Sequence, residues 1–390
     1  MYIGIIRDRK KDENRVALQP HQVTTLCQAG HTVYVEAHSG DNSGFTDEEY
    51  VVAGAKVVEK EKLFEDCELL VKVKSPIPEE YGMFTDRHTL FTYLHYDENF
   101  PVEKINQLIG TGLTSIAYEW VEVNGKYPLL EPMSRLTGYL FAQKTAELCT
   151  RYKGKMCGQY ESFLQNPATA LVVGAGTIGV SALNYFMHNR YRIVLMDKHP
   201  DTVNVRLNQR LETSGIDYVK KYAIKLLQFS NDNPLESKEA LKKLLPDVDI
   251  VLNCAVRRPD LPREKLEYLI DREMIASMKP GSVVSDTTAC DKDLVETAVS
   301  HESLHDFYTV DDVIHYNCDH IPSYVGRSAT ELLSAQTFPY ILEMANQGVV
   351  KTIQSNSGIR KGTSSYKGHF THLYTANKKS IPYTDILEIL

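Results

Sequence analysis

Three glycines near the middle of the chain share a turn between an apolar run and a helical pattern. The turn Gly174-Ala-Gly-Thr-Ile-Gly179 is followed, about twenty residues on, by Asp197 at the end of a strand-like run. Gly174 permits the tight turn, Gly176 leaves room for a pyrophosphate, and Gly179 lets the helix pack on the strand. Unpaired N–H groups at the helix N-terminus would meet the phosphates. Asp197 can accept both ribose hydroxyls and would repel a 2′-phosphate, which favours NAD over NADP. Glycines at this spacing also occur in ordinary turns, but the flanking elements and the acid argue for a dinucleotide site.

Three basic side chains in the first third of the chain follow expected strands. Arg15 comes shortly after the first strand-like run, and Lys74 and His95 each end a later one. Ligands of parallel sheets bind beyond the carboxyl ends of the strands. An arginine with a lysine can hold a carboxylate, and a histidine can move a proton near neutral pH. Taken one at a time, Arg15 and Lys74 are equally typical of surface charges, and His95 of a packed loop residue.

The elements that would position these residues alternate between strand and helix patterns. Strands are expected at 2–6, 31–36, 69–74, 89–95, 113–119, 168–173, 191–196, 248–253 and 282–286, and helices at 20–29, from 46, 136–153, 180–187 and 329–345. A polar tail is expected after Ala345. This alternation predicts an α/β protein with parallel sheets.

The length of 390 residues predicts two domains. We expect two Rossmann-like domains with a cleft between them. The substrate domain would be discontinuous, residues 1–135 plus 323–390, because the helix at 329–345 is expected to return to it. The NAD-binding domain, residues 136–322, would be inserted and would begin with the long connecting helix.

Composition disfavours several classes of partner. The formal net charge is -8 and no long basic block is present, so neither nucleic acid nor an anionic membrane is favoured. Apolar runs are too short to cross a bilayer, and the N-terminus begins directly with a strand, so we expect no membrane span or signal peptide. The seven cysteines are scattered and form no Cys-x-x-Cys pair, which predicts free thiols in a cytoplasmic protein and no metal site.

Eight short segments, in order along nearly the whole chain, resemble the alanine dehydrogenase family and its transhydrogenase-domain relatives. They are Arg15–Ala17, Leu70–Pro76, Leu90–His95, Ser115–Glu119, Pro128–Ser134, Gly174–Gly179, Met278–Val284 and Thr337–Ile341. The resemblance implies an enzyme that transfers a hydride between NAD and an amino acid, interconverting it with a 2-oxo acid and ammonia. The lack of membrane segments argues against an intact proton-pumping transhydrogenase subunit.

The resemblance also implies roles for individual positions. Arg15 and Lys74 would hold the substrate carboxylate, and His95 would hydrogen-bond the substrate oxygen or imine and act as acid and base. Glu119 would lie near the substrate. The positions expected to contact the cofactor are Ser134, Gly174, Gly176, Thr177, Ile178, Gly179, Asp197, Lys198, Cys254, Ala255, Cys290 and His320.

The family's acidic residue after one strand is not at its usual position. In the run Asp286–Asp293, Cys290 occupies that position and Asp291 comes one residue later. Either Asp291 serves as the catalytic carboxylate, or the site has lost it. A neutral thiol cannot replace the charge of a carboxylate beside an amine, although Cys290 is also typical of a small packed residue.

Other departures fall where the family binds its ligands. Arg257 and Arg258 replace an apolar loop, and Arg257 would bind a second carboxylate or a phosphate unless the pair is solvated. His320 replaces an asparagine, with Asp319 adding charge beside it. A glycine-rich segment before the nucleotide strand is replaced by Cys157–Phe163.

Three functional hypotheses follow. The first is an NAD-dependent amino acid dehydrogenase acting on a 2-oxo acid such as pyruvate with ammonium. The second is an imine reductase of the same fold that takes a larger 2-oxo acid or couples it to another amine. The third is a nucleotide-binding protein without catalysis, against which Arg15, Lys74 and His95 argue. The resemblance further implies a homo-oligomer, either a dimer or a hexamer.

Overall fold

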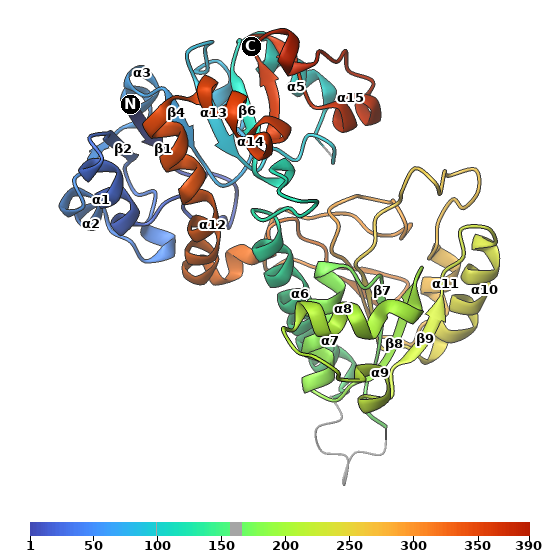
Figure 1. Ribbon diagram of the computed structural model, residues 1–390. Helices are drawn as coiled ribbons and strands as arrows, with labels where there is room; N and C mark the ends of the chain where they lie inside the picture. The colour runs from blue at the N-terminus through green and yellow to red at the C-terminus, as the bar shows by residue number, and fades with distance from the viewer. Residues whose placement is uncertain (99, 157–165) are drawn as a thin grey trace. The chain divides into compact units, whose positions relative to one another are not determined.

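A computed structural model describes residues 1–98, 100–156 and 166–390. The chain divides into unit 1, Met1–Met133 with Pro322–Leu390, and unit 2, Ser134–Ile321. Unit 1 is therefore built from both ends of the chain, and both termini are labelled in it in Figure 1. The boundaries expected from the sequence lie within two residues of these, and the substrate and NAD roles given to the two domains stay predictions.

Unit 1 is built on an eight-stranded sheet with the order β15-β14-β6-β5-β4-β1-β2-β3. Its parallel strands are β1 (Tyr2–Ile5), β2 (Thr32–Glu36), β3 (Lys56–Val58), β4 (Leu69–Val71), β5 (Thr89–Thr92) and β6 (Thr114–Ala117). The first strand pairs with both β2 and β4, so the winding of the sheet reverses between β1 and β4. Doubly wound sheets bind ligands at such a reversal, beyond the carboxyl ends of the strands.

Helices cover this sheet in unit 1 (Figure 1). They are α1 (Pro20–Gln28), α2 (Asp47–Val52), α3 (Lys60–Asp66), α4 (Pro78–Tyr81), α5 (Val102–Gly110), α12 (Gly326–Gln347), α13 (Val349–Ser355), α14 (Ser357–Gly362) and α15 (Leu373–Lys379). The capping box expected at Thr46 is confirmed, because its hydroxyl accepts from the N–H of Glu49, whose carboxylate accepts from the N–H of Thr46.

The prediction of a polar tail after Ala345 is wrong. Residues beyond it form three helices and an antiparallel hairpin, β14 (Thr363–Tyr366) and β15 (His369–Phe370), which extends the sheet beside β6. All four residues of β14 are buried. The hydroxyl of Ser365 lies 2.7 Å from that of Ser115, so these small polar side chains satisfy one another inside the sheet. Their polarity hid a core strand from pattern analysis.

Unit 2 is built on a seven-stranded sheet with the order β12-β13-β11-β10-β7-β8-β9. The strands are β7 (Thr169–Val173), β8 (Arg192–Asp197), β9 (Lys225–Gln228), β10 (Ile250–Asn253), β11 (Val283–Asp286), β12 (Tyr308–Val310) and β13 (Val313–His315). Among the described strands of this sheet, only β12 and β13 pair in the antiparallel direction. The winding reverses between β7 and β10, the equivalent of the reversal in unit 1. The predicted fold class, α/β with two Rossmann-like sheets, is confirmed.

In Figure 1, α6 and α7 lie to one side of β7 and β8, and α10 and α11 lie to the other. The helices are α6 (Glu131–Lys153), α7 (Thr177–His188), α8 (Val203–Arg210), α9 (Tyr218–Lys221), α10 (Pro234–Leu244) and α11 (Arg272–Ala276). The long helix α6 begins five residues before the expected start at 136. A Cβ added to Gly138 on α6 would lie 2.0 Å from the carbonyl oxygen of Ile178, so this glycine lets α6 and α7 approach closely.

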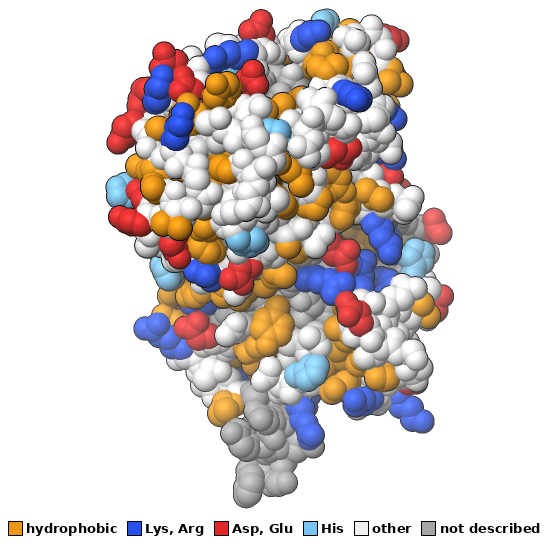
Figure 2. All heavy atoms as spheres, turned by 60° about the vertical axis from the view of Figure 1, so that its left-hand side comes forward, with side chains coloured by type: hydrophobic (Ala, Val, Ile, Leu, Met, Phe, Trp, Pro, Cys, Tyr) orange, Lys and Arg blue, Asp and Glu red, His pale blue; other side chains and the backbone are white. Residues whose placement is uncertain are grey.

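Acidic and basic side chains are interspersed over the face drawn in Figure 2. Hydrophobic side chains on this face are scattered among them. Within the described residues, no helix combines the length and the apolar character that crossing a membrane requires.

Candidate functional site

The strands of unit 1 are shorter than expected, which places the candidate residues on loops. Lys74 and His95 come three residues after the ends of β4 and β5, and Glu119 comes two residues after β6. His95 has a φ of 51°, a left-handed conformation that cannot continue a strand. Because β4, β5 and β6 are parallel neighbours, the three residues lie at one edge of the sheet, beside the reversal of the winding.

Arg15 is buried and held by a carboxylate that sequence analysis did not identify. Its Nε and Nη2 donate to the two carboxylate oxygens of Glu13 at 2.7 and 2.6 Å. Burial raises the pKa of Glu13, but Arg15 outweighs it and the pKa falls to about 2. The Ser323 hydroxyl also donates to Glu13. A guanidinium has five N–H donors. Two point to Glu13 and one to the sulfur of Met133 at 3.4 Å, so two have no acceptor among the described residues and can bind a carboxylate.

Lys74 is buried, and its backbone is positioned by Asp8. The carboxylate of Asp8 accepts from the N–H of Val73 at 2.9 Å and from the N–H of Lys74 at 3.3 Å. The hydroxyl of Thr92 donates to the carbonyl oxygen of Lys74 at 3.0 Å. Asp8 lies just after β1 and Thr92 is the last residue of β5, so these bonds fix the loop of Lys74 between the two strands.

A buried ion pair lies behind this loop. The ammonium group of Lys72 donates to both oxygens of Glu80, at 2.8 and 2.6 Å, and lies 3.9 Å from Asp8. Burial raises the pKa of Asp8 to about 7, although Lys72 acts in the opposite direction. Asp8 therefore holds its proton to a much higher pH than an exposed aspartate does.

His95 lies where it can exchange protons. Its ring stacks on Tyr93 with 5.4 Å between ring centroids, and its Nδ1 lies 3.1 Å from the carboxylate of Glu98. Burial lowers the pKa of His95, but Glu98 outweighs burial, so the pKa is raised above its ordinary value. The charge of Lys74 lowers this pKa, against the effect of Glu98. About a quarter of the side chain (24%) is exposed, so the ring can be reached.

Glu119 is buried behind His95. Its carboxylate accepts from the backbone N–H of His95 at 2.6 Å and from that of Leu94 at 3.1 Å. Burial raises the pKa of Glu119, against the influence of His95. These contacts orient the loop that carries His95.

Each glycine of the turn in unit 2 has the geometry that its expected role requires. Gly174 has a φ of 89°, and Gly176 has open space where a Cβ would lie. A Cβ on Gly179 would lie 1.9 Å from the carbonyl oxygen of Gly174, so only glycine allows α7 to pack here. Thr177 and Ile178 form the first turn of α7, whose N–H groups point toward the turn. These residues fit the pyrophosphate of NAD.

Other predicted cofactor contacts surround this turn in different ways. A Cβ on Gly174 would lie 3.1 Å from that of Ala255, which follows β10 across the reversal of the winding. Burial raises the pKa of the neighbouring Cys254 thiol to about 12, so this thiol stays protonated. Lys198 pairs with Asp260 at 3.1 Å. Ser134 lies half-buried in the first turn of α6.

Asp197 ends β8, as predicted, but is already paired. Arg206, on α8, donates to its two carboxylate oxygens at 2.7 and 3.2 Å. Burial raises the pKa of Asp197, but the bond from Arg206 outweighs it and the pKa is lowered. Nothing in the sequence spacing singled out Arg206.

Asp291 is turned toward a neighbouring loop. Its carboxylate accepts from the N–H and the hydroxyl of Ser300, at 2.9 and 2.8 Å, and the residue is exposed. Cys290 is half-buried. The buried acid nearby is Asp286, which accepts from Asn253 at 2.8 Å and whose pKa burial raises to about 6.

The side-chain donors of Arg257 are all taken up by its own loop and by Asp293 of the loop after β11. Its Nε donates to the Asp293 carboxylate at 2.9 Å, and its Nη groups donate to four carbonyl oxygens, those of Leu261, Leu266, Glu267 and Asp293. All five N–H donors are thus used, and none is left for a substrate. Arg258 is exposed.

His320 is fully buried beside two possible metal ligands. Its Nδ1 lies 2.8 Å from the carboxylate of Asp319 and 3.3 Å from the sulfur of Cys318. These three, and the group of exposed His38 and Asp41 with half-buried Asp47, have ligand atoms close enough to share a cation. The segment Cys157–Phe163 lies outside the described residues.

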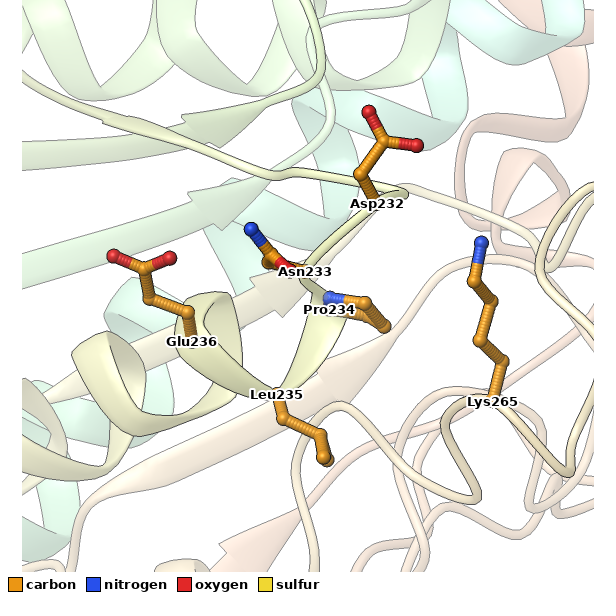
Figure 3. Close-up of a pocket in the computed structure, with 6 residues that line it drawn as sticks. All are labelled: Asp232, Asn233, Pro234, Leu235, Glu236 and Lys265. Carbon is orange, nitrogen blue, oxygen red and sulfur yellow. The ribbon is translucent and has the colours of Figure 1, made fainter.

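A hollow of about 440 Å³ beside the start of α10 is unconnected with these residues. It is lined by Asp232, Asn233, Pro234, Leu235, Glu236 and Lys265. Figure 3 shows their polar ends pointing in different directions, so they do not converge on a ligand.

Two doubly wound sheets, one with a dinucleotide-binding turn, define a dinucleotide-binding protein with two Rossmann-like units. The sequence profile described as "Alanine dehydrogenase/PNT, N-terminal domain" matches residues 4–137, and "Alanine dehydrogenase/PNT, C-terminal domain" matches residues 142–373. The chain belongs to the alanine dehydrogenase/PNT family.

Similar proteins span the whole chain. Alanine dehydrogenase of Bacillus subtilis (strain 168) is 34% identical over 389 residues, which cover 98% of this chain and 96% of that protein. Alanine dehydrogenase of Methanococcus maripaludis is 32% identical over 391 residues, 98% of each chain. A solved structure of L-alanine dehydrogenase has a TM-score of 0.80 and 30% identity, and the match covers 97% of this chain and 99% of that one. The resemblance found in the sequence is confirmed, and so is NAD as the cofactor.

Proposed function

We propose that this protein interconverts L-alanine with pyruvate and ammonia, using NAD. The observation that carries the proposal is that Lys74 and His95 follow neighbouring parallel strands at one edge of the unit 1 sheet, with Arg15 buried in the same unit. It occurs in a chain that is 34% identical to an alanine dehydrogenase over nearly its full length.

Each of these side chains has a role suited to its surroundings. Arg15, held rigid by Glu13, and Lys74 bind the substrate carboxylate. His95 donates a proton to the substrate oxygen or imine nitrogen, or accepts one, and Glu98 stabilises its charged form. Bound NAD supplies the hydride acceptor. Glu119, which the resemblance placed near the substrate, is a positioning residue that acts through His95.

The glycine turn is proposed as the pyrophosphate site, with Ser134, Ala255 and Cys254 among the further contacts. Arg257 and Asp291 are given other roles than the sequence suggested. Arg257 braces its own loop, and Asp291 caps the turn at Ser300.

The test is NADH oxidation with pyruvate and ammonium, measured for the wild type and for His95→Ala. We expect turnover in the wild type and a loss of about a hundredfold or more in His95→Ala, because positioned acid–base groups contribute roughly 10²–10⁴-fold. NADH should still bind the variant. The exposed His21 on α1 provides a control, since His21→Ala should retain full activity. Normal rates in His95→Ala would refute the role of His95.

A second candidate is reduction of an imine made from a larger 2-oxo acid, or from an amine other than ammonia. The orientation of Asp291 toward Ser300 favours it, because the position of the family's carboxylate is then held by Cys290. A screen of 2-oxo acids with ammonium and diverse amines separates the two candidates. Binding of NADH without turnover across the screen would support a nucleotide-binding protein without catalysis.

We further infer a homo-oligomer, a dimer or a hexamer, in the cytoplasm. Free thiols at the six described cysteines support a reducing compartment. Tyr139 on α6 is 42% exposed and packs edge-on against Tyr185 of α7, an aromatic surface suited to a contact with a second copy. Sedimentation of the wild type and of Tyr139→Glu tests this.

A further inference from the structure

Protein donors fill the hydrogen-bonding capacity of the Asp197 carboxylate. Its Oδ1 accepts from the N–H of His199 at 2.8 Å and from Nη2 of Arg206 at 2.7 Å. Its Oδ2 accepts from the N–H of Ala175 at 2.7 Å and from Nη1 of Arg206 at 3.2 Å. A carboxylate has about four lone-pair positions. All four are used, so a ribose hydroxyl can bind Asp197 only by displacing a donor.

Arg206 also changes the charge of this site. The acid at the end of the second strand selects NAD because it accepts the ribose hydroxyls and because its charge repels a 2′-phosphate. Here a guanidinium lies on the carboxylate in a two-pronged ion pair, so that the pair has no net charge. The free acceptor positions of Asp197 and its negative charge, the two properties that exclude a 2′-phosphate, are therefore both weakened.

The guanidinium of Arg206 is placed to meet a ligand. Its side chain is 24% exposed. Its Nη2 also donates to the carbonyl oxygen of His199 at 2.8 Å and its Nη1 to that of Ala175 at 3.0 Å, so a ligand must take over one of these bonds. His199 is itself exposed, so water can satisfy its carbonyl if the bond is exchanged for one to a ligand. The Nε of Arg206 is buried and has no hydrogen-bond partner among the described residues.

A second arginine lies on the same side of α8. Arg210 is one helical turn after Arg206, and its Nη1 donates to the hydroxyl of Thr177, the first residue of α7. Two guanidinium groups thus extend from α8 toward the glycine turn and the acid, where a dinucleotide would place its phosphates and its adenosine ribose.

We propose that the adenosine-ribose site of unit 2 accepts a 2′-phosphate through Arg206, so that the protein uses NADP(H) as well as NAD(H). The planar guanidinium binds phosphate oxygens in pairs, and its ion pair with Asp197 orients it beforehand. The proposal rests on NAD binding at the glycine turn, and it revises the preference against NADP that Asp197 alone had suggested.

The test is direct binding of NADH and NADPH, followed by nicotinamide fluorescence, which does not depend on the substrate. In the wild type we expect the dissociation constants of the two coenzymes to agree within about thirtyfold. Arg206→Ala should weaken NADPH by about tenfold or more, because it removes charge-assisted hydrogen bonds. NADH should bind this variant as well as the wild type or more tightly, since Asp197 regains free acceptor positions.

Arg192 provides the matched control, because it is an exposed arginine at the opposite end of the same strand, β8. Arg192→Ala should leave both affinities unchanged. Arg206→Lys retains the charge without the planar fork and should bind NADPH with an intermediate affinity.

Three results would overturn the proposal. One is a wild type that binds NADH but binds NADPH more than about thirtyfold more weakly. Another is an equal loss of both coenzymes in Arg206→Ala with an unchanged melting temperature, which would make Arg206 a general cofactor contact. If Arg206→Ala does not fold, the Arg206→Lys variant provides the test. An affinity of Arg206→Lys for NADPH equal to that of the wild type would then be the third contradictory result. If the wild type binds neither NADH nor NADPH, the NAD-binding role of the glycine turn itself is wrong. That outcome differs from the three above, in which NADH still binds the wild type.

Discussion

The buried carboxylate of Glu119 accepts a hydrogen bond from the backbone N–H of His95 at 2.6 Å. It also accepts from the N–H of Leu94, at 3.1 and 3.2 Å to its two oxygens. His95 has a left-handed backbone with a φ of 51°, a conformation that few residues adopt without support. Glu119 therefore stabilises the conformation that directs the imidazole out of the sheet edge.

Replacing Glu119 should affect turnover more than cofactor binding. Glu119→Gln keeps one acceptor oxygen and should lower kcat by about tenfold, while the dissociation constant of NADH stays the same. Glu119→Ala leaves two buried N–H groups unsatisfied and should cost roughly 1–3 kcal/mol of stability. Steady-state kinetics and thermal unfolding provide the measurements. A higher KM for the 2-oxo acid with an unchanged kcat would instead indicate that Glu119 binds substrate directly.

Removing Glu98 should shift the pH profile. The carboxylate of Glu98 raises the pKa of His95 because it stabilises the charged imidazolium. In Glu98→Gln that stabilisation is lost, so the pKa of His95 should fall. The limb of the kcat/KM profile governed by His95 should then move to lower pH, and NMR titration of the His95 ring should show the same direction. Glu79, exposed on α4, provides a control, and Glu79→Gln should leave the profile unchanged.

Asp8 should make stability depend on pH near neutrality. Its pKa is raised from 3.8 to about 7, chiefly by burial. The folded state therefore keeps a proton that the unfolded state loses above pH 3.8, and the contribution of Asp8 to stability falls as the pH rises toward 7. Asp8→Asn cannot titrate, so the wild type should lose stability relative to this variant as the pH rises from about 4 to about 7. Urea unfolding of both proteins at several pH values measures the difference, and a constant difference would contradict the prediction.

The two adjacent arginines of the loop after β10 should behave differently. Arg257→Ala removes five hydrogen bonds, among them those to four carbonyl oxygens, and should cost roughly 2–4 kcal/mol. Arg258 is exposed, and Arg258→Ala should change stability by less than about 0.5 kcal/mol. Thermal unfolding compares the two. A stable Arg257→Ala variant with a raised KM for substrate would restore the substrate role that the sequence suggested.

Sequence patterns predicted the structure correctly where the conformation of a residue depends on its immediate neighbours in the chain. The glycine turn, the capping box at Thr46 and the acid at the end of β8 depend on backbone conformation over a few residues, so spacing alone predicted them. The ends of β4, β5 and β6 were overestimated by two or three residues. The apolar pattern continues into buried loops, and periodicity cannot distinguish these from strands.

The sequence by itself determined the family, the two α/β units, the nucleotide turn, and the positions of Arg15, Lys74 and His95 along the chain. Only the tertiary structure decided which charges meet: Glu13 with Arg15, Glu98 with His95, Arg206 with Asp197, and Asp293 with Arg257. It also decided that the serine-rich segment Thr363–Tyr366 is a buried strand. The physical reason is that pairing and burial depend on distances between side chains in space. A carboxylate that binds a ligand and one that is satisfied by an arginine have the same sequence signature until those distances are known.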